Sequence, residues 1–456
     1  MARNSYFERF QNWLGDKLKN KKKKSARGIS GEELSRQLEN PELKIIDIRS
    51  PDAYNGWALA GEPRGGHIRG AKNIAYKWSG YIDWIEIVQS KNILPEDSLV
   101  LYGYQKNKID QVAHKFRQAG YPNIRVYYDF CKQWSTNPNF PLDKLAKHKH
   151  LVPAKWLKEL IDTGQAPQYN NKKFIICHCH YQNRDDYNKG HIPGALAVDT
   201  NSLESPETWN RRSSKEIKKT LENLGITSNT TVVLYGRFSY PNKNDPFPGS
   251  SAGHLGAIRT ALIIHYAGVK DIRILNGGLQ SWQDQGYKIT KKETKNYPVV
   301  NFGARIPANP SVMIDIKEAK EILKSENKNL ISVRSWPEFI GQTSGYNYIG
   351  KKGRIPGAIF GNCGSDAYHM ENYRNLDHSL REYHQIEKAW QKTGITPDKH
   401  NAFYCGTGWR ASEAFFAAWL MGWTKISVFD GGWFQWSNDK NNPYQTGVPE
   451  KFLTDK

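Results

Sequence analysis

Short apolar runs alternate with longer amphipathic stretches along this chain, and the alternation occurs three times. Each copy opens on an apolar run, at residues 44–49, 173–177 and 329–334. A second run follows at residues 99–103, 232–236 and 402–405, and after a helical stretch a third run comes at residues 124–128, 272–275 and 426–429. Strands that alternate with helices predict βα units, and therefore a mostly parallel sheet with helices on both faces.

A glycine turn follows the first apolar run of every copy. It reads Gly-His-Ile-Arg-Gly-Ala at residues 66–71, Gly-His-Ile-Pro-Gly-Ala at 190–195 and Gly-Arg-Ile-Pro-Gly-Ala at 353–358. The copies are too far apart and too unequally spaced for a solenoid, whose repeats span about 20–50 residues. We therefore predict three tandem globular domains. They should occupy residues 29–145, 146–295 and 296–456, after a basic leader at residues 1–28.

Length and composition agree with this organisation. The 456 residues correspond to roughly three domains of ~150 residues, and a hydrophobic content of 38% excludes a wholly disordered chain. The longest apolar stretch, near residues 414–423, is about half of the ~20 residues that a membrane-spanning helix needs. Five cysteines are too few for a disulfide scaffold of this length, which leaves room for a reactive thiol.

The formal net charge of +20 favours acidic partners, and the leader carries a large share of it. Apolar residues at helical spacing precede a lysine run at residues 21–24. We favour a docked terminal helix with a solvated linker; a basic amphipathic helix on a membrane or an acidic partner is the alternative. No zinc-finger or RNA-binding signature occurs, so we expect no nucleic-acid partner. Without the apolar core of a secretory signal, the sequence predicts a cytoplasmic protein, or a periplasmic one if a signal peptide was removed.

The chemistry is expected where the second apolar run of a copy ends, because function in open parallel sheets gathers at the carboxyl ends of the strands. The three copies differ at this point. Copies one and two have Gly103 and Gly236, whereas copy three has Cys405. We therefore predict that the first two domains are inactive and that the third carries a nucleophile.

The residues after Cys405 suit a reactive thiol. Gly406, Thr407 and Gly408 form a short loop into a helix, so backbone N–H groups and the helix N-terminus converge on the sulfur. Arg410 adds a full positive charge, and together these groups should stabilise a thiolate. The Cys-x4-Arg spacing is one residue tighter than the Cys-x5-Arg of cysteine phosphatases. A smaller loop suits a sulfur atom better than a tetrahedral phosphate.

Taken together, these motifs resemble those of the rhodanese-type sulfurtransferases: the Asp-x-Arg strand at residues 47–49, the glycine turns, the loop after Cys405 and the Asp-Gly-Gly at residues 430–432. Three copies with the cysteine loop only in the last resemble the three-domain bacterial thiosulfate sulfurtransferases. The resemblance implies an α/β fold of three rhodanese-like domains, each a mostly parallel five-stranded sheet flanked by helices. It also implies a thiosulfate sulfurtransferase in which Cys405 takes a sulfane sulfur as a persulfide and passes it to an acceptor.

The same resemblance implies roles for the loop residues. Backbone N–H groups would hold the persulfide, with Arg410 favouring an anionic donor and Trp409 at the pocket rim; the substrate-binding residues are Gly406, Thr407, Gly408, Trp409 and Arg410. The partners would be a small anionic sulfur donor and a thiol or cyanide acceptor, including a protein thiol. No cofactor and no metal are implied. Two alternatives stay open: mercaptopyruvate as the donor, and a non-enzymatic sulfur carrier whose inactive domains dock a partner.

Copy three departs from the family pattern. Ser332 stands where copy one has Asp47, and Arg354 replaces the histidine of the other two glycine turns. The Gly-Thr-Gly sequence at residues 406–408 is closer to a mercaptopyruvate-type loop. These departures concern the sulfur donor rather than the persulfide chemistry.

Three further features have simpler interpretations. The Cys-His-Cys-His run at residues 177–180 lies in a predicted strand, where its cysteines share one face and its histidines the other. A single alternating run cannot close a tetrahedral metal site, so we interpret these residues as structural. Cys131 and Cys363 are interpreted as packing residues. The long loop at residues 237–254 is expected to contact another domain or a partner.

Overall fold

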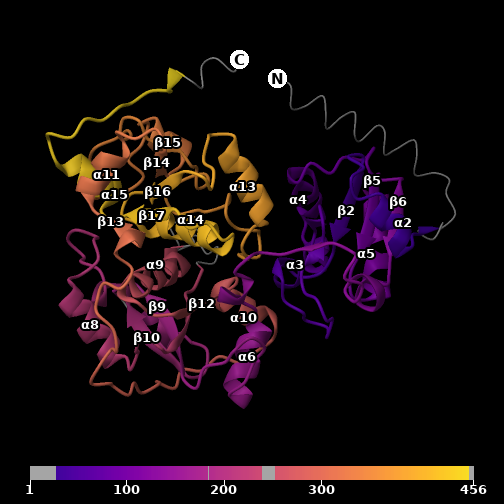
Figure 1. Cartoon of the computed structure of the whole chain (residues 1–456), viewed down its shortest axis with the longest axis horizontal. Helices are drawn as coiled ribbons and strands as arrows, with labels where there is room; N and C mark the ends of the chain where they lie inside the picture. Colours follow the sequence, from indigo (N-terminus) through magenta and orange to yellow (C-terminus); the bar gives the residue numbers. More distant parts are fainter. Residues whose placement is uncertain (1–26, 183, 239–251, 451–456) are drawn as a thin grey trace. The chain divides into compact units, whose positions relative to one another are not determined.

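The computed structural model describes residues 27–182, 184–238 and 252–450, and Figure 1 shows the course of the chain. Most of the predicted leader and the loop segment 239–251 lie outside the described residues, so the expectations for them stay predictions. The chain forms two compact units that divide between Leu145 and Ala146. The first unit contains one five-stranded sheet and the second contains two.

The first unit is built on a sheet of parallel strands in the order β1-β6-β5-β2-β4. The strands are Arg27–Gly28 (β1), Leu43–Asp47 (β2), Lys72–Asn73 (β4), Ser98–Tyr102 (β5) and Ile124–Tyr127 (β6). The helices are Gly31–Arg36 (α2), Pro51–Asn55 (α3), Trp84–Ser90 (α4) and Lys106–Gln118 (α5), with turns at Tyr76–Gly80 (η1) and Phe130–Trp134 (η2). Alternate residues of β5 enter two different apolar clusters, Leu101 in one and Val100 in the other, so both faces of the sheet are buried.

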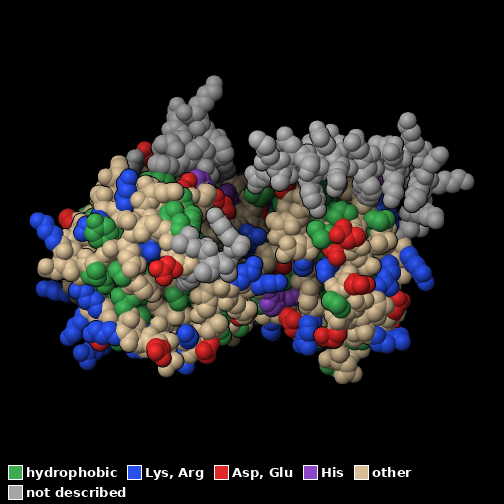
Figure 2. Space-filling view, turned by 90° about the horizontal axis from the view of Figure 1, so that it is seen from above, with side chains coloured by type: hydrophobic (Ala, Val, Ile, Leu, Met, Phe, Trp, Pro, Cys, Tyr) green, Lys and Arg blue, Asp and Glu red, His purple; other side chains and the backbone are tan. Residues whose placement is uncertain are grey.

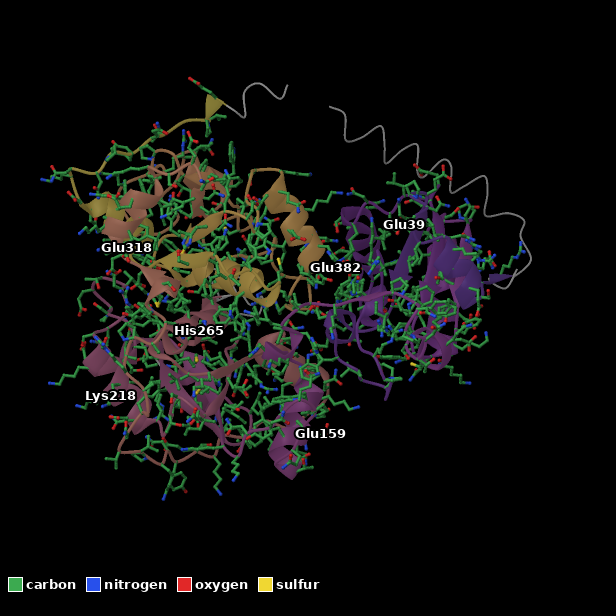
Figure 3. The ribbon with its side chains drawn as sticks, in the orientation of Figure 1. Glu39, Glu159, Lys218, His265, Glu318 and Glu382 are labelled. Atoms are coloured by element: carbon green, nitrogen blue, oxygen red, sulfur yellow. The ribbon has the colours of Figure 1, made fainter. Side chains whose placement is uncertain are left out.

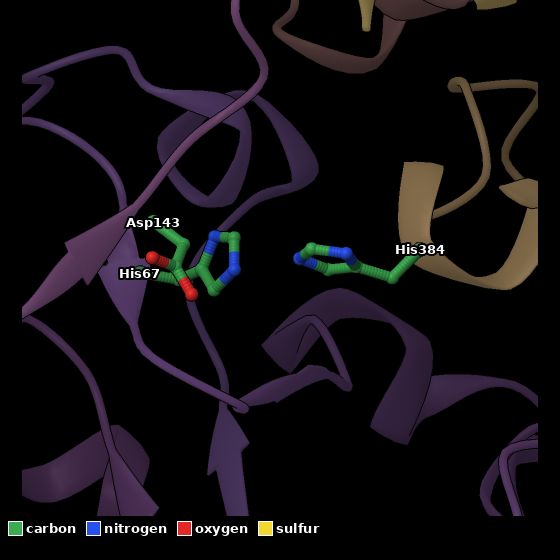
Figure 4. A group of neighbouring side chains, drawn as sticks. All are labelled: His67, Asp143 and His384. Carbon is green, nitrogen blue, oxygen red and sulfur yellow. The ribbon is translucent and has the colours of Figure 1, made fainter. Parts of the chain in front are cut away.

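The glycine turn of the first unit forms a short antiparallel ribbon. Strand β3 (His67–Ile68) pairs with β7 (Leu142–Asp143), which places His67 opposite Asp143, as Figure 4 shows. The imidazole of His67 is fully buried and stacks on the ring of Tyr54, with the ring centroids 3.7 Å apart. Its Nδ1 lies 2.8 Å from the carbonyl oxygen of Tyr54. The histidine of this turn is therefore a packing residue.

The other two glycine turns repeat this arrangement with one substitution. His191 stacks on Tyr187 with centroids 3.6 Å apart. In the third copy the guanidinium of Arg354 lies 5.2 Å from the centroid of the Phe339 ring. An aromatic ring and a flat polar group thus pack at the same point of each copy, which gives the replacement of histidine by Arg354 a structural reason.

The first sheet of the second unit has the order β10-β9-β11-β12-β8, again with parallel pairs only. Its strands are Leu151–Val152 (β8), Phe174–His180 (β9), Ala195–Asp199 (β10), Thr231–Tyr235 (β11) and Asp271–Leu275 (β12). Its helices are Ala154–Thr163 (α6), Asp185–Asn188 (α7), Ser214–Asn223 (α8), Ala252–Ala267 (α9) and Gly278–Asp284 (α10), with turns at His148–His150 (η3) and Thr200–Ser202 (η4).

The second sheet of this unit has the order β13-β17-β16-β14-β15, also parallel throughout. Its strands are Met313–Ile314 (β13), Lys328–Ser332 (β14), Ile359–Phe360 (β15), His400–Tyr404 (β16) and Ile426–Phe429 (β17). Its helices are Ile316–Ile322 (α11), Trp336–Phe339 (α12), Tyr383–Gln391 (α13), Trp409–Leu420 (α14) and Gly432–Asn438 (α15), with a turn at Pro310–Val312 (η5).

Helices α9 and α14 join the two halves of the second unit, and they lie next to each other in Figure 1. Both are apolar on nearly all sides, as expected of helices that are buried on more than one face. His265, labelled in Figure 3, lies in the last turn of α9 and contacts the rings of Phe415 and Trp419 on α14. Burial lowers the pKa of His265 to about 4, so its imidazole is neutral in this contact at neutral pH.

These three all-parallel sheets confirm the predicted α/β fold. Several edge strands were not visible in the apolar pattern, because β1, β8 and β13 have only two residues each. Basic and acidic side chains are interspersed on the face shown in Figure 2. Among the described residues, no helix is long and apolar enough to cross a membrane.

The Cys-His-Cys-His run forms the carboxyl end of strand β9. Cys177, His178 and Cys179 are at most 1% exposed. Burial raises the pKa of both thiols and lowers the pKa of His178 to about 3. At neutral pH these side chains are therefore uncharged core residues, as a structural role requires.

Candidate active site

Cys405 lies at the junction of β16 and α14. Strand β16 is the middle strand of its sheet, and the cysteine that follows it is fully buried. The backbone N–H of Gly408 donates a hydrogen bond to Sγ of Cys405 over 3.2 Å. Gly408 immediately precedes α14 and has a φ of +94°, which a residue with a side chain rarely adopts. The loop therefore presents its amide to the sulfur because glycine is at this position.

The loop is fixed from two sides. The carbonyl oxygens of Cys405 and Gly406 accept hydrogen bonds of 2.8 Å and 2.9 Å from the N–H groups of Trp433 and Phe434, at the start of α15. On the other side, a β-carbon at Gly406 would collide with the ring of Tyr346. The Asp-Gly-Gly segment seen in the sequence thus leads into the helix that holds the cysteine loop.

Arg410 is fully buried and paired with Glu338. Its Nη1 and Nη2 each donate a hydrogen bond of 2.8 Å to a different carboxylate oxygen of Glu338. Burial by itself would raise the pKa of Glu338, but the Arg410 guanidinium outweighs it and, with Arg334, holds that pKa at about 2. Nη1 of Arg410 also lies 3.2 Å from Sγ of Cys363. Two buried charges of opposite sign therefore lie directly behind the loop.

The pairing bears on the role expected of Arg410, which was to favour an anionic donor. Its guanidinium is fully buried against Glu338, a carboxylate that Arg334 also contacts, so the two arginines and the glutamate together carry a net charge of +1. The pairing also changes the interpretation of Cys363, whose sulfur lies against Arg410 instead of only packing among apolar residues. Burial raises the pKa of Cys363 to about 12, so this thiol is neutral at physiological pH.

Two tyrosines lie beside the loop that follows Cys405. The hydroxyl of Tyr346 donates a hydrogen bond of 3.1 Å to the carbonyl oxygen of Ala367, and the side chain of Tyr348 hydrogen-bonds Thr407. Burial raises the pKa of both phenols, and a negative charge on Cys405 raises it further. Both hydroxyls therefore stay protonated at neutral pH.

The half of the second unit that is built on strands β8 to β12, which is the predicted second domain, contributes further aromatic rings to this region. Trp209 stacks on Tyr348 with centroids 5.3 Å apart, and Tyr181 stacks on Trp209 at 5.5 Å. Trp409, which follows the loop, contacts both Tyr181 and Trp209 edge-on. We call Tyr181, Trp209, Tyr346, Tyr348 and Trp409 the aromatic cluster. Its members come from both halves of the second unit and surround the loop of Cys405.

The equivalent positions in the other copies have no space for a cysteine side chain. A β-carbon at Gly236 would collide with the backbone carbonyl of Gly253, and one at Gly103 would lie 2.7 Å from Cγ1 of Ile48. A cysteine at either glycine would therefore require its neighbours to shift, the backbone at Gly236 and the Ile48 side chain at Gly103.

The predicted site residues at 405–410 thus form one continuous loop and helix start around Cys405. Sequence reasoning missed Glu338, the two tyrosines and the residues of the second domain. The sequence did contain a signal for Glu338. Copy three has Ser332 where copy one has Asp47, so a buried Arg334 requires a carboxylate from elsewhere in the chain. In copy one, Arg49 pairs with Asp47, whereas in copy three Nε of Arg334 lies 3.3 Å from Glu338, four residues further on.

The comparisons with a family model and with curated proteins point to the same family. The rhodanese-like domain model matches residues 30–137, 153–285 and 315–439. The chain is 37% identical to the thiosulfate sulfurtransferase YnjE of Escherichia coli, over 90% of this chain and 91% of that protein. It is 29% identical to the sulfur carrier protein TtuD of Thermus thermophilus, over 57% of this chain and 87% of that protein.

Similar solved structures add a second activity to the comparison. The anaerobic ergothioneine biosynthesis enzyme from Chlorobium limicola, solved in complex with its natural substrate trimethyl histidine, has 57% identity and a TM-score of 0.90, and covers 93% of this chain and 100% of that one. A variant of EanB with a cysteine persulfide, in a tetrahedral intermediate state with ergothioneine, has 57% identity and a TM-score of 0.90, and covers 92% of this chain and 100% of that one.

Proposed function

Since this chain belongs to the family of rhodanese-like sulfurtransferases, we propose that Cys405 takes up a sulfane sulfur as a persulfide and transfers it to the imidazole ring of a trimethylated histidine. The contact between the Gly408 amide and Sγ supports the first step, because backbone donors stabilise negative charge on sulfur. The 57% identity to an enzyme solved with trimethyl histidine supports the second step.

The observation that carries the choice of acceptor is the aromatic cluster beside Cys405. Quaternary ammonium groups bind to the faces of Trp and Tyr rings, where each contact contributes about 0.5–2 kcal/mol. Trp209, Tyr346 and Tyr348 form a stacked series of such rings that reaches the cysteine loop. Because the stacked rings partly cover one another's faces, the open surface of the series lies at Tyr348, which is 42% exposed. A trimethylammonium group bound there would place the attached imidazole beside Thr407 of the cysteine loop.

The transfer balances without a further reactant. The terminal sulfur of the persulfide anion forms a bond to C2 of the imidazolium ring, which gives a tetrahedral carbon. The C2 proton then leaves to solvent, the carbon–sulfur double bond forms and the S–S bond breaks, which returns Cys405 as a thiolate. The ring carbon is oxidised by two electrons and the transferred sulfur is reduced by two, so no external oxidant is needed.

For the sulfur donor we propose thiosulfate, which the similarity to a thiosulfate sulfurtransferase supports, with mercaptopyruvate as the alternative. Because Arg410 is paired with Glu338, the donor would be held by the loop amides and the N-terminus of α14. The same persulfide also permits a second candidate function, transfer from thiosulfate to a thiol or cyanide. The match to YnjE favours that candidate.

Donor loading followed by acceptor competition tests the proposal. The reduced full chain is treated with thiosulfate or mercaptopyruvate, and intact-mass and peptide mass spectrometry locate the added sulfur. We expect one sulfur on Cys405. Addition of trimethylhistidine or cyanide should then remove it, and the product of the first reaction should be the ring thione, detected by its mass.

Two variants serve as controls. Cys405→Ser should abolish loading and product formation, whereas Cys131→Ser, which removes a half-buried thiol of the first unit, should behave as the wild type. Thione formation by Cys405→Ser would contradict the mechanism. Turnover with cyanide but not with trimethylhistidine would favour the second candidate, and loading of Cys405 without turnover on any acceptor would favour a sulfur carrier.

A further inference from the structure

A side chain from the second domain lies directly against the loop of Cys405. A β-carbon at Gly408 would lie 2.9 Å from Nη1 of Arg259, a residue of helix α9. Arg259 is fully buried, and its Nη1 has no hydrogen-bond partner among the described residues. Gly408 is the residue whose amide bonds the cysteine sulfur, so Arg259 packs against the residue that presents this amide.

The carboxylate of Glu204 joins this arginine to the aromatic cluster. One oxygen of Glu204 accepts a hydrogen bond of 3.0 Å from Nε of Arg259. The other accepts one of 2.8 Å from the indole N–H of Trp409, the first residue of α14. Glu204 is fully buried, so a single carboxylate of the second domain holds two elements on either side of the same loop.

Asp430, which follows β17, completes the contact from the third domain. Nη2 of Arg259 donates to one oxygen of Asp430, and the backbone N–H and Nη1 of Arg211 donate to the other over 2.9 Å and 2.7 Å. The backbone carbonyl oxygen of Asp430 lies 3.1 Å from the position of that same β-carbon, so both residues crowd the same side of Gly408. Arg259 and Asp430, which are themselves hydrogen-bonded, therefore pack together against Gly408.

We propose that Glu204 and Arg259 are positioning residues of the sulfur-transfer reaction, which hold the Gly408 amide and the Trp409 indole in the arrangement that Cys405 requires. The proposal rests on sulfur transfer from Cys405. It gives the second domain, which lacks a nucleophile of its own, a part in the site of the third. Misplacement of a catalytic group by about 1 Å can lower a rate by about a hundredfold, so residues without substrate contact can limit the rate.

The protonation of Glu204 offers a direct readout. Burial raises the pKa of Glu204 to about 7, opposed by the attraction of Arg259 and by the hydrogen bonds from Arg259 and Trp409, and increased by the nearby Asp430. Tyr181 also faces Glu204, and burial raises its own pKa, so it remains neutral. When Glu204 gains a proton it loses its charge attraction for Arg259. The ratio of the wild-type kcat to the kcat of Glu204→Gln should therefore rise with pH through about 7, because the titrations of the acceptor and of Cys405 are common to both proteins.

The test uses the full chain and three variants. Glu204→Gln keeps the size of the side chain but removes its charge, and Trp409→Phe keeps a ring but removes the indole donor. Asp271→Asn is the matched control, because Asp271 is paired with Arg273 in the second domain and contacts neither the cysteine loop nor Trp409. Steady-state kcat and KM are measured with trimethylhistidine and with cyanide between pH 5.5 and 9, together with thermal unfolding.

We expect Glu204→Gln to lower kcat roughly tenfold to a hundredfold with both acceptors, to change KM for thiosulfate little, and to fall further below the wild-type kcat as the pH rises through about 7. Trp409→Phe should lower kcat in the same direction, and Asp271→Asn should keep the kcat and pH profile of the wild type. A Glu204→Gln variant with the wild-type kcat and pH profile would overturn the proposal, as would equal losses in Asp271→Asn. If the wild type is active with cyanide but not with trimethylhistidine, trimethylhistidine is refuted as the acceptor. The kcat values of the variants with cyanide then still test the roles of Glu204 and Arg259.

Discussion

The guanidinium of Arg410 and the carboxylate of Glu338 form a two-bonded ion pair behind the cysteine loop, with both hydrogen bonds 2.8 Å long. Arg410 belongs to the first turn of α14, and Glu338 belongs to α12, which it also caps by accepting hydrogen bonds from Ser335. One carboxylate therefore links the start of the catalytic helix to the start of another helix. The pair fixes the first turn of α14, and because Arg334 contacts the same carboxylate, the buried cluster keeps a net charge of +1.

Loss of the carboxylate should destabilise the protein and disable the loop. In Glu338→Gln the buried Arg410 and Arg334 lose their shared counter-charge, and breaking one side of a buried pair typically costs about 3–5 kcal/mol. Urea unfolding should show this loss, and donor treatment should load less sulfur on Cys405. Glu321→Gln, which removes an exposed ion pair with Lys324, is the control and should leave the free energy of unfolding nearly unchanged. Equal stability of the two variants would contradict the assigned role of Glu338.

The ionisation of Glu338 should make the free energy of unfolding depend on pH. The pKa of Glu338 is lowered from its ordinary 4.5 to about 2, so the folded state favours the ionised form. Its contribution, about 3 kcal/mol, is fully present above pH 4.5 and is lost as the pH falls towards 2. The difference in unfolding free energy between wild type and Glu338→Gln should therefore shrink between pH 5 and pH 3. Chemical denaturation at several pH values measures it, and a constant difference over this range would contradict the assignment.

A single substitution to cysteine should not give the second copy a working sulfur site. A β-carbon at Gly236 would meet a backbone carbonyl, which cannot rotate away, so Gly236→Ala should destabilise the chain by about 1–3 kcal/mol. Gly350→Ala is the control, because a β-carbon there would have no neighbour within 4 Å. Introducing Gly236→Cys into Cys405→Ser should not restore sulfur loading, as mass spectrometry would reveal. Restored loading would show that the second copy retains a working loop.

The sequence allowed the fold and the centre of the site to be predicted because both depend on local pattern. The three apolar strands of each copy and the Gly-Thr-Gly loop before α14 are contiguous in the chain, so periodicity and turn chemistry were enough to place Cys405. The charge of Arg410 could be read from the sequence, but its partner could not. Glu338 lies on a different helix, and only tertiary packing brings it to the arginine.

The contribution of the second domain was out of reach for the same reason. Trp409 was predicted to line the pocket from its place beside Cys405, yet its indole donates to Glu204, more than two hundred residues earlier in the chain. Nothing in the local pattern around Glu204 marks it, because it meets Arg259 only when α9 packs beside turn η4, and it meets Trp409 only when α14 packs on α9. Residues that join two domains carry no periodic signal of their own.

The aromatic cluster should determine affinity for the acceptor rather than the chemistry at sulfur. Tyr348 stacks between Tyr346 and Trp209, so Tyr348→Leu removes a ring from the middle of the series, whereas Tyr348→Phe keeps the ring and removes only the hydroxyl that bonds Thr407. If the rings bind a trimethylammonium group, Tyr348→Leu should raise the KM for trimethylhistidine about 3- to 30-fold, and Tyr348→Phe should change it little. Cyanide has no such group, so kinetics with cyanide should be similar in both variants. Steady-state assays with the two acceptors measure this, and a loss that is the same for both would mean that Tyr348 acts on the cysteine loop instead of the acceptor.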